Sequence, residues 1–154
     1  MIHYVKGDVY FDEDLDIIYN PVGVRESSGF LKKVKKIYPE AFEYYKEKVW
    51  MYSVNELLGD IQVVYLGNQR CIMNGFCRDR YGKINKLAMT KNLVELCNLA
   101  YEYSLSVGIE NGLGSKGSEK KWINLIIEEV FKDVEVSVYV LEREKSKFKY
   151  KIIK

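Results

Sequence analysis

The sequence predicts an α/β fold, with strands and helices alternating around a mostly parallel or mixed sheet. Short apolar runs alternate along the chain with segments in which apolar residues recur at helical spacing. The strand pattern is clearest at 134–140, where valines occupy every second position. The length of 154 residues suits a single domain, and 47% hydrophobic with 30% charged residues is typical of a globular protein.

The N-terminal elements are two short strands, expected at 2–5 and 15–19. Asn20-Pro21 predicts the end of the second strand, because proline fixes φ and has no backbone N–H. A loop follows at 22–29, and Ser27 or Ser28 within it suits the N-cap of the next helix.

The rest of the chain continues the alternation, with Pro39 separating two helices and Gly67-Asn68 turning a hairpin. The expected elements are helices at 30–37 and 41–49, strands at 61–66 and 70–74, a helix at 87–103, a strand at 105–109, a helix through 122–130 and the strand at 134–140. The C-terminal segment 143–154 alternates apolar residues with lysines, so it is either a short edge strand or a basic, mobile tail.

The amino-acid composition argues against several classes of partner and site. The net charge is +2, from 24 Lys and Arg against 22 Asp and Glu, which argues against nucleic acid as a partner. Three scattered cysteines and a single histidine argue against a zinc site and suggest reduced thiols in a cytosolic protein. No secretory signal or membrane-spanning run is visible, so we expect a cytoplasmic protein that binds no membrane and no metal.

Two loops, 20–29 and 108–117, have the features of an anion-binding site. Each is expected between the carboxyl end of a strand and the start of a helix, where ligands bind in open α/β sheets. Glycines allow close approach of the backbone, and a helix N-terminus favours a diphosphate. GxxxxGK[ST] does not occur, and glycine content alone leaves plain turn loops as an open alternative.

A series of short segments follows a recognisable order. The segments are YVKGD at 4–8, DIIYNPV at 16–22, Gly29, KKIYPE at 35–40, LGDIQ at 58–62, IMNGF at 72–76, IENGLG at 109–114, Trp122, IEEVF at 127–131 and VYVL at 138–141. In this order the chain resembles a macro domain, the ADP-ribose-binding module, over residues 1–141. It looks most similar to the branch of terminal ADP-ribose-glutamate hydrolases and ADP-ribose-1''-phosphatases. The resemblance implies one domain, residues 1–154, with a three-layer α/β/α sandwich and a mixed, mostly parallel central sheet.

The resemblance also implies a role for each matching position. At the adenine end, Asp8 matches a carboxylate that accepts a hydrogen bond from the adenine amino group, and Tyr139 matches an aromatic side chain beside the ring. Taken alone, Asp8 equally suits a turn or a helix cap, and Tyr139 suits a half-buried strand position.

The remaining matches surround the distal ribose and the diphosphate. They are Asn20, Val22 and Phe76 near the distal ribose, Ser27, Ser28 and Gly29 between ribose and diphosphate, and Asn111, Gly112, Leu113 and Gly114 at the diphosphate, with Val9, Phe30, Ile109 and Glu110 completing the expected ligand-binding set. Core packing is the alternative role for Phe76.

Departures from the family pattern affect the expected chemistry. Gly23 stands where an asparagine helps hydrolytic members orient the distal ribose or a water. The lysine nucleophile and the aspartate of the glutamate-hydrolase branch correspond to Arg78 and Gly114 here. Arginine stays protonated, so that mechanism is not expected unless Lys83 or Lys116 takes the place of the lysine nucleophile. Glu110 and Asn111 are the candidates for positioning a water, and the catalytic residues stay unassigned.

We therefore expect a protein that binds ADP-ribose or an NAD-derived ADP-ribose derivative, as a reader or a sequestering protein. An ADP-ribosylated protein is a further expected partner, no cofactor is expected, and the chain is expected to be a monomer. A hydrolase acting on the distal ribose is the alternative, and a nucleic-acid binder using the basic tail ranks lowest.

Overall fold

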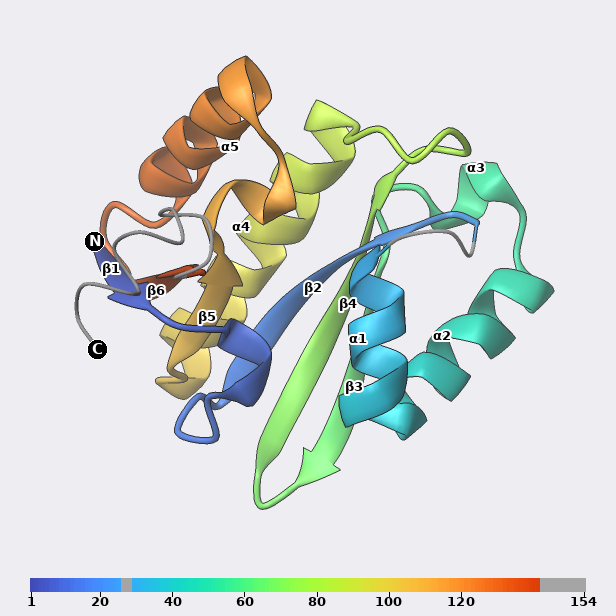
Figure 1. Cartoon of the computed structure of the whole chain (residues 1–154), viewed down its shortest axis with the longest axis horizontal. Helices are drawn as coiled ribbons and strands as arrows, with labels where there is room; N and C mark the ends of the chain where they lie inside the picture. The colour runs from blue at the N-terminus through green and yellow to red at the C-terminus, as the bar shows by residue number, and fades with distance from the viewer. Residues whose placement is uncertain (26–28, 142–154) are drawn as a thin grey trace, which may run out of the picture.

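The computed structural model describes residues 1–25 and 29–141, which form one mixed sheet with helices on both faces (Figure 1). Its strands are β1 (Ile2–Lys6), β2 (Ile17–Gly23), β3 (Ile61–Gly67), β4 (Arg70–Arg78), β5 (Val107–Glu110) and β6 (Val136–Val140). The order across the sheet is β1-β6-β5-β2-β4-β3, and every neighbouring pair is parallel except the β3–β4 hairpin. The expected mixed, mostly parallel sheet is confirmed. The segment 143–154 and both Ser27 and Ser28 lie outside the described residues.

Helices complete the three layers. They are α1 (Gly29–Ile37), α2 (Pro39–Met51), α3 (Val54–Leu57), α4 (Lys86–Tyr103) and α5 (Gly117–Val130), with short 3-10 turns η1 (Val9–Phe11) and η2 (Asn111–Gly114). In Figure 1, α4 and α5 lie on one side of the strands and α1 and α2 on the other. No helix within the described ranges has the length and apolar character needed to cross a bilayer.

Strand alternation divides the buried side chains between the two faces. The larger core joins α4 and α5 to one face, through residues such as Met73, Leu93 and Ile127. On the other face, Ile18 and Ile72 pack with side chains of η1, α1 and α2. The first face is apolar along its strands, whereas the second carries Asn20, Asn74 and Glu110 toward its carboxyl end.

Local sequence signals explain most helix starts. Pro39 opens α2, where its missing N–H costs no hydrogen bond, and the Asn85 side chain caps α4 by accepting from Ala88 N. The sequence reasoning missed α3. Its signal is the capping box of Ser53 and Glu56, in which each side chain accepts from the backbone N–H of the other residue.

The expected end of the second strand at Asn20-Pro21 is wrong. Strand β2 continues to Gly23, and Pro21 pairs in register with Gly75 of β4. On its other side, β2 pairs with β5 only at Ile17 and Ile18. That side of β2 is therefore open at Pro21 among the described residues, and proline is tolerated there as it is in an edge strand.

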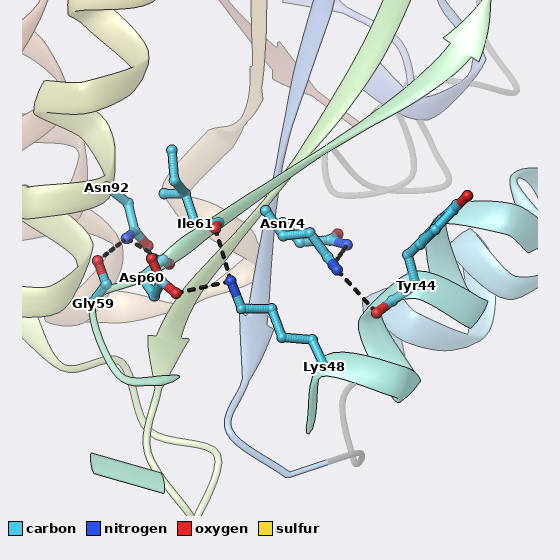
Figure 2. Close-up of polar contacts among 8 residues, drawn as sticks. Tyr44, Lys48, Gly59, Asp60, Ile61, Asn74 and Asn92 are labelled. Atoms are coloured by element: carbon cyan, nitrogen blue, oxygen red, sulfur yellow. Dashed lines mark hydrogen bonds and ion pairs between the residues drawn. The ribbon is translucent and has the colours of Figure 1, made fainter. Parts of the chain in front are cut away.

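Gly75 is required by close packing between β2 and α4. A Cβ at this position would lie 2.4 Å from Tyr19 Cε1 and 2.6 Å from Asn92 Oδ1. These two side chains are themselves joined, because the Tyr19 hydroxyl donates to Asn92 Oδ1 at 2.9 Å. Asn92 in turn donates to the carbonyls of Gly59 and Asp60, as Figure 2 shows.

We expect Gly75→Ala to lower the free energy of unfolding by about 3 kcal/mol, as overpacking does in a buried site. Urea denaturation measures the change. Gly67→Ala is the control, because its Cβ meets no atom within 4 Å and only the φ of +90° costs energy, about 1 kcal/mol. Equal stability of Gly75→Ala and the parent protein would contradict this packing.

Candidate functional site

The two predicted loops lie at the same edge of the sheet. Because β2, β5 and β6 are parallel neighbours, their carboxyl ends meet there, followed by the segments that lead to α1 and α5. Glu110 at the end of β5 pairs in register with Tyr139 of β6, and Val22 of β2 pairs with Phe76 of β4. This edge is the candidate site, since open α/β sheets bind ligands at the carboxyl ends of their strands.

Tyr10 is the central side chain of the candidate site. It is fully buried, and its hydroxyl donates to Asn20 Oδ1 at 2.8 Å. Burial raises the pKa of Tyr10 well above its usual value, and the charges of Glu110 and Asp8 raise this pKa further. The phenol therefore stays protonated at physiological pH and always donates.

A chain of amides continues from Tyr10 through the sheet. Because Asn20 uses its oxygen for Tyr10, its nitrogen donates onward to Asn74 Oδ1 at 2.8 Å. Asn74 then donates to Gln62 Oε1 at 3.0 Å, and Gln62 donates to the Tyr44 carbonyl at 2.9 Å. Figure 2 shows this last part, with Asn74 on the strands and Tyr44 on α2. One fixed donor thus sets the orientation of two buried amides, Asn20 and Asn74, and of the partly exposed amide of Gln62.

Asp8 has structural contacts on both carboxylate oxygens. Oδ1 accepts from Tyr10 N at 3.1 Å and so caps η1, which is the role that the sequence left open beside adenine recognition. Oδ2 pairs with Lys33 Nζ of α1 at 2.5 Å. The Lys33 ammonium also lies 5.6 Å from the centre of the Tyr10 ring. Asp8 therefore ties η1 to α1 across the candidate site.

The β5–α5 loop has an unusual backbone. Gly112 and Gly114 have φ of +59° and +80°, and Leu113 between them has φ of +51°, in the left-handed region. Asn124 of α5 holds this loop by accepting from Gly112 N at 2.9 Å and donating to Asn111 Oδ1 at 2.8 Å. Arg78 of β4 donates to the Leu113 carbonyl at 3.0 Å. Side chains from two other elements thus hold the strained turn.

The two candidates for positioning a water are both engaged inside the protein. Glu110 is 3% exposed and acts on the pKa of Tyr10, so its carboxylate points into the molecule. The Asn111 oxygen accepts from Asn124.

Several expected ligand-binding residues have buried side chains. Tyr139 is 5% exposed, and its hydroxyl donates to Asp12, so that burial and this hydrogen bond raise the Tyr139 pKa. Phe76 is fully buried and stacks on Tyr45 with ring centres 5.7 Å apart, in a cluster that includes Val22. Val9 and Ile109 are also fully buried. Gly29 begins α1, and Phe30 follows it in the first turn.

The cysteines do not supply a nucleophile. Burial raises the pKa of both Cys71 and Cys77 to about 11, so the reactive thiolate is scarce at neutral pH. The described residues contain no group of three histidine, cysteine or acidic side chains able to hold a metal ion.

Comparison with solved structures identifies the architecture. The chain superposes on the macrodomain of Thermus aquaticus DarG with a TM-score of 0.74 and 19% identity, covering 91% of this chain and 98% of that one. The chain has the macrodomain fold. The macrodomain of Mycobacterium tuberculosis DarG gives a TM-score of 0.72 at 21% identity, covering 90% and 97% of the two chains.

A macrodomain protein from Streptomyces coelicolor gives a TM-score of 0.74 at 19% identity, covering 91% of this chain and 99% of that one. No protein-family model and no curated protein matches the sequence. The macrodomain architecture therefore rests on the arrangement of the elements in space.

Sequence reasoning missed the residues that hold this macrodomain edge together. Tyr10 lies two positions after the expected Asp8, and a polar aromatic residue so close to a strand end was an available signal. Lys33 is one of several lysines in α1, and the sequence does not show that it pairs with Asp8. Asn124 lies about two turns into α5 and belongs to no motif.

We expect Tyr10→Phe to lower the free energy of unfolding by about 1–3 kcal/mol, because Asn20 Oδ1 then loses its buried donor. Chemical denaturation measures the loss. Tyr101→Phe is the matched control, since Tyr101 is 78% exposed and its hydroxyl faces water. A Tyr10→Phe variant as stable as the control would show that the amide chain does not depend on this phenol.

Proposed function

We propose that this macrodomain-fold protein binds ADP-ribose or a related ADP-ribose derivative at the carboxyl edge of its sheet. The observation that carries the proposal is the turn at Gly112–Gly114, which precedes the start of α5 at Gly117. Consecutive left-handed residues beside a helix N-terminus form a concave backbone surface that suits a diphosphate. The segment IENGLG at 109–114, which resembles the family's diphosphate loop, supplies this turn.

The adenine end of the proposed ligand lies at Asp8. A carboxylate accepts several hydrogen bonds, so Asp8 is able to receive one from an adenine amino group while it keeps Tyr10 N and Lys33. Lys33 places a positive charge beside this carboxylate, which favours an anionic nucleotide. Tyr139 contributes through its place at the end of β6, because its hydroxyl is used by Asp12.

The contacts of Arg78 support binding of the ligand without its hydrolysis. Arg78 corresponds to the lysine nucleophile of the glutamate-hydrolase branch, yet it donates to the carbonyls of Gly82 and Leu113 at 3.0 Å. Its guanidinium thus holds the diphosphate turn in place and offers no nucleophile. We therefore propose a reader or a sequestering protein, whose partners are free ADP-ribose-type nucleotides or ADP-ribosylated proteins.

We expect titration calorimetry with ADP-ribose to show micromolar binding that Gly112→Ala weakens at least tenfold, about 1.4 kcal/mol. A Cβ at Gly112 would lie 2.5 Å from Lys120 Cγ, and the φ of +59° disfavours alanine, so the turn must shift. Gly67→Ala is the control, because it has the same kind of backbone strain at the opposite end of the sheet.

The Gly67→Ala control distinguishes a damaged binding site from a general loss of protein stability. Gly67→Ala should bind ADP-ribose as the parent protein does. Asp8→Asn, which keeps an oxygen for Tyr10 N, should also weaken binding. No binding by the parent protein, or equal binding by Gly112→Ala, would contradict the proposed site.

We expect no turnover of ADP-ribose-1''-phosphate or of a glutamate-linked ADP-ribosyl peptide, even at high protein concentration. The reason is that Arg78 stays protonated and Gly114 has no carboxylate. Phosphate release and release of free ADP-ribose measure the two activities. Turnover that is abolished by Glu110→Ala would establish the hydrolase alternative instead.

A further inference from the structure

The free edge of β3 lacks the features that usually protect an edge strand. β3 ends the sheet, and no strand pairs with its outer side among the described residues. Its sequence, IQVVYLG at 61–67, contains neither a charged residue nor a proline. The opposite edge strand, β1, carries Lys6 and His3, and His3 lies 3.6 Å from Glu135. Unprotected edge strands pair readily with another strand.

The hydrogen-bond pattern shows which backbone groups of β3 face outward. Phe76 N donates to the Asp60 carbonyl at 2.9 Å, so the alternation of an antiparallel pair turns Gln62 and Val64 toward β4. The N–H and C=O groups of Val63 and Tyr65 therefore point to the open side. The Ile61 carbonyl, next in the same alternation, already accepts from Lys48 Nζ at 3.2 Å (Figure 2).

Exposed aromatic side chains flank this edge on both faces of the sheet. Tyr65 is 79% exposed on the face that carries α4. On the other face, a hollow of about 270 Å³ lies between α2 and β3, lined by residues that include Lys48 and Gln62. Three exposed apolar side chains of the α2 segment line the same hollow, namely Tyr44, Met51 and Tyr52. Tyrosine and methionine are enriched in protein interfaces.

We propose that β3 pairs antiparallel with β3 of a second copy of this chain, about a two-fold axis through Val64. This axis places the outward groups of Val63 opposite those of the partner's Tyr65, so that each strand supplies the donors and acceptors that the other needs. It also packs Tyr65 against the partner's Val63, an aromatic and β-branched cross-strand pair. The two α2 helices then lie on the same face of one continuous sheet.

The available area suits a second copy. The exposed parts of Tyr44, Met51, Tyr52 and Tyr65 amount to roughly 500 Å², more than half of the ~800 Å² that each partner buries in a standard interface. The backbone and the smaller side chains of β3 are available for the remainder. A lone extended peptide would cover the strand and leave much of α2 open, whereas a two-fold places matching aromatic surfaces side by side. The monomer expected from the sequence stays a prediction, and solution mass decides between the two.

Sedimentation equilibrium of the full chain over a range of concentrations tests the proposal. We expect a mass near two chains for the parent protein and near one chain for Tyr65→Lys, which puts a charge at the centre of the pairing. Tyr101→Lys is the matched control, because Tyr101 has 78% exposure on α4, away from β3, and it should remain dimeric. Circular dichroism and thermal unfolding confirm that each variant is folded.

A second variant tests the backbone pairing itself. Tyr65→Pro removes an N–H that points outward and keeps the hydrogen bonds of β3 to β4, so it should also give a monomer. A parent protein that is monomeric at every concentration would overturn self-pairing. A dimer that persists in both Tyr65 variants would overturn it as well, because the interface would then lie elsewhere on the molecule.

Discussion

The hydrogen bond from the Tyr10 phenol to Asn20 fixes the arrangement of much of the candidate site. It joins η1 to the centre of the sheet, and it sets the direction in which the Asn20, Asn74 and Gln62 amides donate. The backbone N–H of Tyr10 also donates to the Asp8 carboxylate, which pairs with Lys33 of α1. A buried polar network is stabilising only when each member is satisfied, so the orientations of Asn20 and Asn74 depend on the phenol's staying protonated.

The difference between the two faces of the sheet explains why the site forms on one side of the edge. The α4 and α5 face is filled by a continuous apolar core, which fixes the strands without using polar groups. The α1 and α2 face carries its amides and Glu110 near the carboxyl ends, where the helices approach the strands through hydrogen bonds. The polar side chains therefore position the loops, and the backbone of those loops is left for a ligand.

Sequence periodicity predicted the elements whose signal is local. The alternating valines gave β6 (Val136–Val140), and the spacing of Leu93 and Leu96 gave α4. It failed at Pro21, because tolerance of proline depends on how far β5 extends beside β2. For the candidate site, the motif order drew attention to 109–114, where the structure has a turn with left-handed residues. It did not identify Asn124, since that contact exists only after α5 has packed against the turn.

In the function proposed above, Arg78 is the residue that separates binding from catalysis. A lysine ammonium is a flexible point charge that becomes a nucleophile on losing a proton, whereas a guanidinium keeps its proton and donates in fixed directions. At position 78 those directions lead to the Leu113 and Gly82 carbonyls, so the side chain stabilises the strained turn. If the turn binds a diphosphate as proposed, the contacts that hold the turn in shape also engage the side chain that a nucleophilic mechanism would need. Preorganisation lowers the entropic cost of binding, and a site that keeps its shape while lacking a nucleophile is suited to holding its ligand.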